Sequence, residues 1–135
     1  MSEQGMSEPH SSDLRLTPST ASAVTPEAMR SFVDGVGDPN PVHTDPEFAA
    51  KAGLPNVVVQ ASHTTAIALD ALIAQFGSDE ILNLDIRLRG PIFPGDEVTV
   101  SPVSFGELDR GVELRNQRGD VVATGIVVMR GDPDE

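Results

Sequence analysis

The sequence predicts a single domain of the α+β class, in which one long helix lies across an antiparallel sheet. Residues 61–76 contain no Gly or Pro and carry Ala, Leu and Ile on nearly every face, which indicates a helix enclosed by other elements. After Gly77 the apolar residues recur with a period of two, as in strands. The length of 135 residues is typical of one domain.

The first half of the chain contains signals for an extended arm and short helices. Residues 14–24 predict a weak first strand or extended arm, because two leucines precede a run of Ser, Thr and Ala. Residues 25–27 form a helix start, with a Thr N-cap, a Pro at the first helical position and an acid in the first turn. Apolar residues spaced three to four apart continue this helix to Val36. Residues 46–51 predict one or two further helical turns.

The second half of the chain contains strand signals. Residues 82–89 alternate Leu or Ile with Asn, Asp and Arg, which predicts a strand with one solvent-facing side. The valines of residues 98–103 predict another strand. Residues 112–117 and 121–129 predict a hairpin around the Arg-Gly-Asp turn at 118–120. One buried helix followed by antiparallel strands is the pattern of an α+β fold.

The composition excludes several classes of function. Nine Lys and Arg against 21 Asp and Glu give a net charge of −12, which disfavours binding to nucleic-acid phosphates and to anionic membrane surfaces. The absence of cysteine excludes disulfides, a thiolate nucleophile and thiolate metal ligands. The chain also lacks the Trp and Tyr residues on which bases and sugars stack. We therefore expect neither nucleic acid nor membrane among its partners.

The two ends of the chain predict tails outside the folded domain. Residues 1–13 are polar and rich in Ser and Glu, which is typical of disorder, and residues 131–135 form a short acidic tail. The expected domain spans residues 14–130. The first residues contain no apolar signal-peptide core, and the longest nearly apolar run, residues 121–129, is far shorter than the roughly 20 residues that span a bilayer. The expected location is the cytoplasm.

Residues 37–45, GDPNPVHTD, are the segment with the clearest chemical content. Asp38 and His43 lie five positions apart in a loop that two prolines keep out of helical geometry. A rigid loop of this kind is able to aim a carboxylate and an imidazole at one water, with one group taking a proton and the other giving one. The alternative interpretation is a capping Asp beside a surface histidine.

Three segments resemble one family. Residues 37–49, GDPNPVHTDPEFA, resemble the signature of the MaoC-like dehydratases, the (R)-specific enoyl-CoA hydratases of the hot-dog fold, whose pattern is Gly-Asp-x-Asn-Pro-aliphatic-His-x-Asp followed by an Ala. Residues 89–96, RGPIFPGD, and 116–125, NQRGDVVATG, resemble further strand and hairpin segments of that family. The resemblance covers roughly residues 25–130. It implies a single hot-dog domain, with a long central helix wrapped by an antiparallel β-sheet.

The resemblance also implies an activity. Asp38 and His43 match the family's catalytic pair, which adds water reversibly, with syn stereochemistry, to a trans-2-enoyl-CoA and gives a (3R)-3-hydroxyacyl-CoA. Which of the two takes the first proton stays open. Asn40 is expected to fix the loop through the backbone, and Asp45 to cap the turn that begins at Pro46. No cofactor or metal is implied, since water, the two side chains and a backbone N–H supply the whole reaction.

The chain departs from the family pattern at the start of the long helix. The family has an aliphatic-x-His-Gly there, with the Gly N–H helping to bind the thioester oxygen, whereas this chain has Gln60 and Ala61. The backbone donor is retained at Ala61, where a helix N-terminus favours oxyanion charge, but the added methyl group narrows the approach. His63 is either a polar group at the mouth or a packed histidine. With Asn40, these residues form the candidate oxyanion and substrate-binding set.

Three alternative functions stay open. The chain is the active subunit of a heteromeric hot-dog hydratase that needs a partner chain, or it is a natural-product dehydratase or cyclase that acts on a polyketide-like intermediate. A hot-dog thioesterase, which uses an acid on the long helix, is the third; Asp70 is the acid available there. That hypothesis predicts that Asp70→Asn abolishes turnover and that Asp38→Asn spares it.

The expected partners are a thioester substrate and a second copy of the chain. We prefer acyl-CoA to an acyl carrier protein as the substrate carrier. Carrier proteins are usually acidic, and this chain, with a net charge of −12, would repel them. Arg87 and Arg89 share one strand face, where they pair with substrate phosphates or with Asp85. The resemblance implies a homodimer whose sheets join edge to edge, with the site where one subunit's loop meets the other's helix. A heteromer with a different hot-dog subunit is the alternative.

Overall fold

The structure of the chain is a computed structural model. It describes residues 15–37, 40–105 and 108–131. The expected tail of residues 1–13, Asp38 of the candidate pair and residues 132–135 lie outside the described residues. No helix in the described ranges has both the length and the apolar character needed to cross a membrane.

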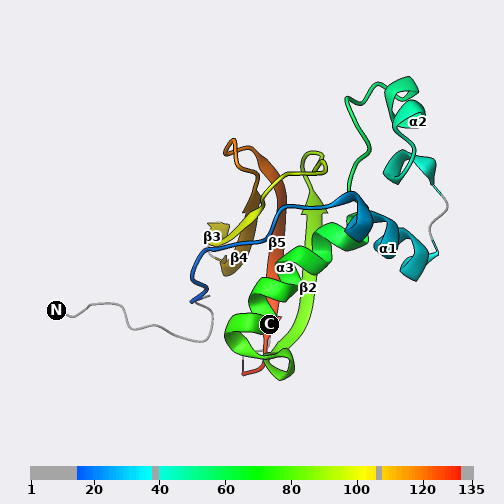
Figure 1. Cartoon of the computed structure of the whole chain (residues 1–135). Coiled ribbons are helices and arrows are strands. Elements are labelled where there is room, and N and C mark those ends of the chain that lie inside the picture. Colours follow the sequence, from blue (N-terminus) through cyan, green and yellow to red (C-terminus); the bar gives the residue numbers. More distant parts are fainter. Residues whose placement is uncertain (1–14, 38–39, 106–107, 132–135) are drawn as a thin grey trace.

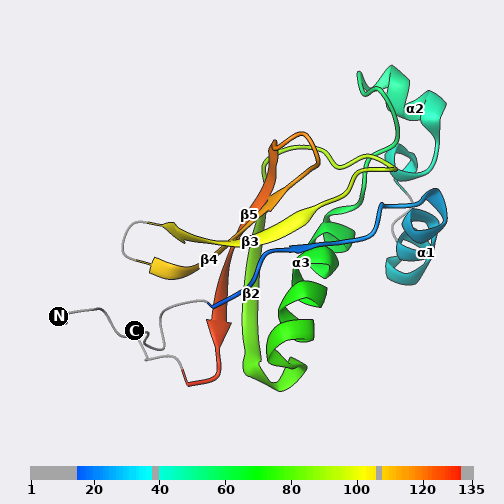
Figure 2. The ribbon, with the colours of Figure 1, turned by 60° about the vertical axis from the view of Figure 1, so that its left-hand side comes forward.

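The fold consists of one antiparallel sheet, a long helix and two short helices (Figure 1). The five strands follow the order β1-β3-β4-β5-β2, and α3 lies across one face of the sheet. Figure 2 shows α1 and α2 beyond the end of the sheet, near the residues where α3 begins. The elements are β1 (Ser19–Thr20), α1 (Pro26–Val36), η1 (Pro41–His43), α2 (Pro46–Lys51), α3 (Ala61–Phe76), η2 (Ser78–Glu80), β2 (Ile81–Leu88), β3 (Thr99–Phe105), β4 (Leu108–Arg115) and β5 (Val121–Met129).

The helices have the ends that the sequence predicts. The Thr25 side-chain oxygen accepts a hydrogen bond from the Ala28 N–H at 3.0 Å and so caps α1. Gly37 ends the same helix in the left-handed conformation, with φ 72°. Helix α3 covers all of residues 61–76, and Gly77 follows it. The capping signals are thus confirmed.

Strand β4 differs from its prediction, since it begins at Leu108 rather than Val112. The start of β4 is decided by pairing with β3, in which Phe105 lies opposite Leu108. The residues from 109 to 111 are Asp, Arg and Gly, which do not predict a strand by themselves. The end of β4 is decided by Asn116, whose Oδ1 accepts hydrogen bonds from the N–H groups of Arg118 and Asp120, each at 3.0 Å. These bonds close the β4–β5 turn.

The N-terminal segment is an extended arm, as one of the two predictions for it states. Strand β1 comprises Ser19–Thr20, which pair with β3. Leu16 and Val24, on either side of this short strand, are both buried in the core. Beyond the short strand, the arm is held by these two apolar side chains and by main-chain bonds, such as the one from the Ala21 N–H to the Val98 carbonyl at 2.9 Å.

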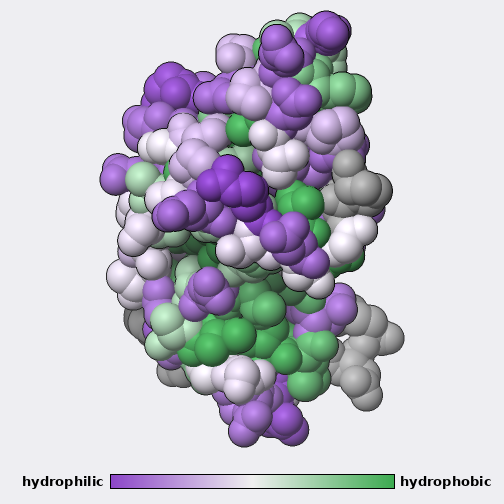
Figure 3. All heavy atoms as spheres, turned by 45° about the vertical axis from the view of Figure 1, so that its right-hand side comes forward, coloured by the Kyte–Doolittle hydropathy of each residue, from purple (hydrophilic) through white to green (hydrophobic). Residues whose placement is uncertain are grey.

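The long helix is covered on one side and open on the other. Ala68 and Leu72 are fully buried against the sheet, whereas Ile73 is 36% exposed. The sequence predicted a helix enclosed all round, and within the described residues this is wrong. The sheet covers one face of α3, and no second layer in the described ranges covers the outer face, where Asp70 and Ile73 are exposed. Figure 3 shows apolar surface on the lower half of this side of the molecule.

Gly125 of β5 is a position where the fold needs the smallest residue. A Cβ atom there would lie 2.6 Å from Ile86 Cδ1, 3.0 Å from the Asp85 carbonyl oxygen and 3.1 Å from Val112 Cγ2. Because the Asp85 oxygen is main chain, moving Ile86 alone does not make room. Gly125→Ala is expected to lower the free energy of unfolding by about 1–3 kcal/mol, measured by urea denaturation.

Gly35 of α1 supplies the matched control, since a Cβ atom there meets nothing within 4 Å. Gly35→Ala in this helix is expected to stabilise the protein by roughly 0.5–1 kcal/mol. Equal urea midpoints for the two variants would contradict the steric account of Gly125.

Candidate active site

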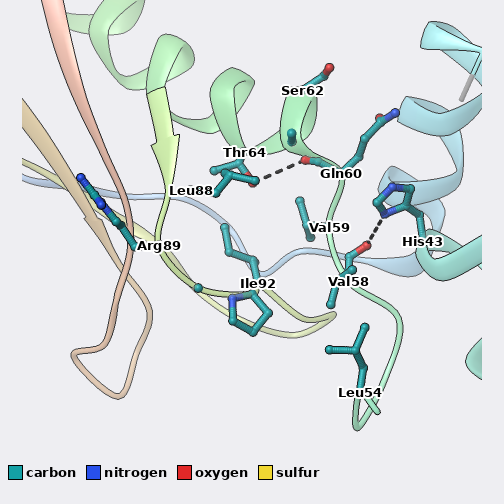
Figure 4. Close-up of a pocket in the computed structure, with 13 residues that line it drawn as sticks. His43, Leu54, Val58, Val59, Gln60, Ser62, Thr64, Leu88, Arg89 and Ile92 are labelled. Carbon is teal, nitrogen blue, oxygen red and sulfur yellow. Dashed lines mark hydrogen bonds between the residues drawn. The ribbon is translucent and has the colours of Figure 1, made fainter. Parts of the chain in front are cut away.

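A cavity of about 590 Å³ lies where α3 begins (Figure 4). Its walls come from the segment before α3, the first turn of that helix, the residues that follow β2, and η1. His43 stands on one side of the cavity and Leu88 on the other. The lining residues are His43, Leu54, Val58, Val59, Gln60, Ala61, Ser62, Thr64, Leu88, Arg89, Gly90, Pro91 and Ile92.

His43 is held by a main-chain group of the opposite segment. Its Nδ1 lies 2.9 Å from the carbonyl oxygen of Val58 (Figure 4). A carbonyl oxygen accepts hydrogen bonds and does not donate them, so Nδ1 carries the proton in this contact. In the neutral ring, Nε2 is then the acceptor. The fold thus sets the tautomer in which the remaining ring nitrogen is able to take a proton.

Two side-chain caps fix the backbone on either side of His43. The Asn40 Oδ1 accepts a hydrogen bond from the Val42 N–H at 3.0 Å, at the start of η1. The Asp45 Oδ1 accepts hydrogen bonds from the N–H groups of Glu47 and Phe48, at 3.0 and 3.3 Å, at the start of α2. The cap predicted for Asp45 is confirmed.

The extended segment before α3 ties the walls of the cavity together. The Val58 N–H donates to the Val42 carbonyl at 3.2 Å, on the side of η1. The next residue, Val59, donates from its N–H to the Ile92 carbonyl at 2.8 Å, on the side that follows β2. Main-chain bonds from the extended segment before α3 therefore join η1, which carries His43, to the residues that follow β2.

The first turn of α3 lines the cavity and begins with an N–H that has no acceptor within the helix. Gln60 occupies the N-cap position without a side-chain cap bond, and its carbonyl accepts from the N–H groups of His63 and Thr64, each at 3.0 Å. Ala61 is the first helical residue, lines the cavity, and finds no acceptor for its N–H among the described residues. The partial positive charge of the helix N-terminus favours an anionic oxygen at this point.

Comparisons with known proteins show which family this chain belongs to. The pattern of the family described as "MaoC like domain" matches residues 11–126. The chain belongs to the MaoC-like family. Among its relatives, a UPF0336 protein of Streptomyces avermitilis is 34% identical over 121 residues, 76% of this chain and 80% of that protein. The enoyl-CoA hydratase ChsH3 of Mycobacterium tuberculosis is 37% identical over 97 residues; these cover 69% of this chain and 34% of that enzyme.

A solved structure supports the MaoC-like fold. The (R)-hydratase from A. caviae involved in PHA biosynthesis superposes with a TM-score of 0.70 at 24% identity, over 86% of this chain and 96% of that one. The predicted single hot-dog domain of the α+β class is thereby confirmed. The family of this chain contains hydratases and dehydratases, which are hydro-lyases, so the predicted general kind of enzyme agrees with its relatives.

The other candidate residues of this MaoC-like domain are not all at the cavity. Gln60 and Ala61 line it, whereas Asn40 acts on the loop backbone. Asp70 is exposed on α3 and is absent from the described lining of the cavity. The described residues also contain no cluster of three or more His, Asp or Glu side chains able to hold a metal ion.

The two arginines singled out for substrate phosphates lie on the sheet. Arg87 and Arg89 share a shallow depression with Asp85 and Thr124. The Arg89 Nε–H donates to the Thr124 Oγ1 at 3.1 Å. In Figure 4 the Arg89 side chain points away from the other labelled residues, although Arg89 itself is one of the residues that line the cavity.

His63 is a packed histidine, the second of its two predicted roles. Its ring stacks on Phe32 of α1, with centroids 4.1 Å apart and planes 6° from parallel. The side chain is buried, and no described residue bonds its Nδ1. Desolvation lowers the pKa of His63 below the usual value, against the opposing charge of Asp70. The folded chain therefore favours a neutral ring.

This burial predicts a pH dependence of stability. The unfolded chain binds the His63 proton more tightly, so the stability contribution is complete above about pH 6.5 and falls as the pH drops through that value. The His63→Gln variant is expected to lose less stability on acidification than the unaltered chain, because it lacks the group whose proton the unfolded chain binds more tightly. Urea unfolding above and below the titration range measures this difference. Equal losses in the two proteins would show that another group titrates.

Proposed function

We propose that this chain is a hydratase that adds water to the double bond of a trans-2-enoyl thioester, giving a (3R)-3-hydroxyacyl thioester in a reversible reaction. The observation that carries the proposal is the bond between His43 Nδ1 and the Val58 carbonyl, which leaves Nε2 as a proton acceptor beside an apolar cavity. The enoyl-CoA hydratase ChsH3, with 37% identity, makes a CoA thioester the preferred substrate class.

The proposed reaction uses one water between His43 and Asp38. His43 Nε2 takes a proton from the water, and the hydroxyl group adds to the β-carbon of the enoyl group. The carboxylate of Asp38 accepts the second hydrogen bond of the water and orients it. The imidazolium of His43 then gives this proton to the α-carbon on the same face, which makes the addition syn and returns the ring to its neutral form. The atoms of one water are thus divided between the two carbons.

The thioester oxygen becomes negative as the hydroxyl adds, and the proposed donor for it is the Ala61 N–H. Because this group is main chain at a helix N-terminus, it stabilises charge without reorganisation. Gln60 and the apolar walls formed by Leu54, Val58 and Leu88 then define the space for the acyl group. The methyl group of Ala61 limits the width at that point.

The test is hydration of trans-2-enoyl-CoA, followed by the loss of enoyl absorbance, with a short, a medium and a bulky acyl group. We expect turnover of at least one substrate, lost in both Asp38→Asn and His43→Ala. Release of free CoA thiol, if abolished by Asp70→Asn and retained in Asp38→Asn, would instead establish a thioesterase. Turnover of none of the three by the folded protein would reject simple enoyl-CoA substrates.

A further inference from the structure

Thr64 is a polar side chain in a deeply buried part of the cavity lining. It is 2% exposed and lies one turn into α3. It shares this part of the lining with Val59, Gln60 and Ile92, which are also buried, whereas Ser62 of the same lining is exposed to solvent. A thioester whose carrier stays in solvent therefore places its acyl group, and not the carrier, beside Thr64.

The Thr64 hydroxyl has only a weak hydrogen bond within the protein. Its Oγ1 lies 3.4 Å from the Gln60 carbonyl oxygen (Figure 4), whereas O–H···O bonds are usually about 2.5–3.0 Å long. That carbonyl already accepts the N–H groups of His63 and Thr64, each at 3.0 Å, and these occupy both of its lone pairs. The hydroxyl makes no other bond among the described residues. A buried hydroxyl in this situation gains free energy when a ligand offers a better acceptor.

Thr64 differs from an ordinary helical threonine. Threonines inside helices often bond back to the carbonyl four residues earlier, and such a bond has no role in binding. The bond of Thr64 is long for this purpose, and its side chain lines a cavity whose other walls there, Val59 and Ile92, are apolar. Thr65, the next residue, lines a separate groove of about 310 Å³ between α3 and β2. It therefore serves as a matched control for Thr64.

The peptide group between Gln60 and Ala61 separates the Thr64 hydroxyl from the proposed oxyanion site. This peptide is trans, so its C=O and N–H point in opposite directions. A thioester oxygen bound to the Ala61 N–H and the hydroxyl next to the Gln60 carbonyl then lie on opposite sides of it, roughly 6–8 Å apart. The hydroxyl thus faces a group farther along the acyl chain and not the thioester oxygen.

We propose that Thr64 selects acyl groups that carry an oxygen atom, as a hydroxyl or a keto group, beyond the double bond. The Thr64 hydroxyl donates a hydrogen bond to that oxygen, and Val59 and Ile92 contact the hydrocarbon part of the chain. Thr64 does not touch the reacting carbons, so it determines specificity and takes no part in proton transfer. This assignment rests on the function proposed above, because the Ala61 N–H decides which end of the substrate lies beside Thr64.

Matched substrates test this selection in the unaltered chain. The set consists of trans-2-hexenoyl-CoA derivatives with a hydroxyl group on one of the carbons beyond the double bond, each compared with the analogue that has a methyl group in its place. We expect kcat/KM of at least one hydroxylated substrate to exceed that of its methyl analogue by roughly three- to tenfold, the effect of one hydrogen bond. An equal or higher kcat/KM for every methyl analogue would overturn the proposal.

Three variants show whether the Thr64 hydroxyl is responsible. Thr64→Val keeps the shape of the side chain and removes the hydroxyl, so the ratio of the two kcat/KM values should fall to about one or below. Thr64→Ser keeps the hydroxyl and should keep the preference, and Thr65→Val should leave the ratio unchanged. A preference that survives in Thr64→Val would assign the recognition to another group and overturn the proposal. Thr64→Ala gives the same comparison if the valine variant does not fold.

Binding measurements separate this recognition from the hydration reaction. Saturated hydroxyhexanoyl-CoA thioesters and their methyl analogues cannot be hydrated, so calorimetric titration measures recognition alone. We expect the hydroxylated ligand to have a Kd lower by roughly three- to tenfold, and the difference to disappear in Thr64→Val. If this difference appears but no enoyl-CoA is hydrated, the proposed function fails and the recognition by Thr64 stands. If hydration occurs but neither kcat/KM nor Kd favours the hydroxyl group, the hydratase stands and the role of Thr64 is overturned.

Discussion

Replacement of His43 by alanine is expected to lower kcat for enoyl-CoA hydration by roughly 10²- to 10⁴-fold, the range typical of a lost general acid or base. The reason is the fixed tautomer, since the Nδ1–H is engaged by the Val58 carbonyl at 2.9 Å and Nε2 is the atom left to take the proton from water. Initial rates at saturating substrate, followed by enoyl absorbance, measure the loss. KM should change less than kcat, because the ring acts on water rather than on the acyl chain.

His43→Asn separates chemistry from structure. The amide nitrogen of Asn is able to reach the Val58 carbonyl in place of Nδ1, so the loop keeps its anchor, but no proton acceptor of similar basicity remains. We expect this variant to unfold at the same urea concentration as the unaltered chain and to be as inactive as His43→Ala. If it retains more than about a tenth of the activity, His43 is a positioning residue rather than the base.

Ala61→Pro is expected to reduce kcat by roughly 10²- to 10³-fold, the cost of one lost oxyanion donor. Proline removes the N–H at the first position of α3, a position where helices commonly carry it. The preceding residue, Gln60, already has φ −69° and ψ 149°, the extended conformation that proline requires of its neighbour. The helix should therefore persist while the donor disappears. Steady-state kinetics and circular dichroism measure the two effects.

Ala61→Gly is the matched control, because it keeps the N–H and removes the methyl group. It should retain turnover on short enoyl groups and improve turnover of bulky ones. Full activity of Ala61→Pro, with an intact helix, would move the oxyanion donor to another group, such as the N–H of Ser62.

The sequence predicted the helices better than the strand boundaries. The ends of α1 and α3 depend on local chemistry, a Thr cap, a Pro and two glycines, and these signals act within a few residues. The start of β4 at Leu108 depends instead on pairing with β3, which no local pattern of polar residues reveals. The first residue of β4 is thus set by pairing with a neighbouring strand and not by the strand propensity of its own residues.

At the candidate site, sequence reasoning found His43 and Ala61 but not what holds them. His43 is bound by the main-chain carbonyl of Val58. Because every residue type has a main-chain carbonyl, the sequence does not show which one binds the histidine. The wall supplied by Leu88 and Gly90 was missed for a similar reason, since it depends on how β2 continues past its last residue. The position of Asp38 relative to His43 stays a prediction.

The main-chain anchoring of His43 has a consequence for how the specificity of this domain can change. The ring is held by a carbonyl oxygen of the same segment whose side chains form the cavity wall, and that segment is itself bonded through backbone groups to Val42 and Ile92. Substitutions at Leu54 or Val58 therefore reshape the acyl space without removing a bond to the proposed base. A library of variants at such wall positions should therefore yield an altered preference for acyl chain length with little loss of rate. The side chains of the wall change, while the main-chain bond that orients the His43 ring is kept.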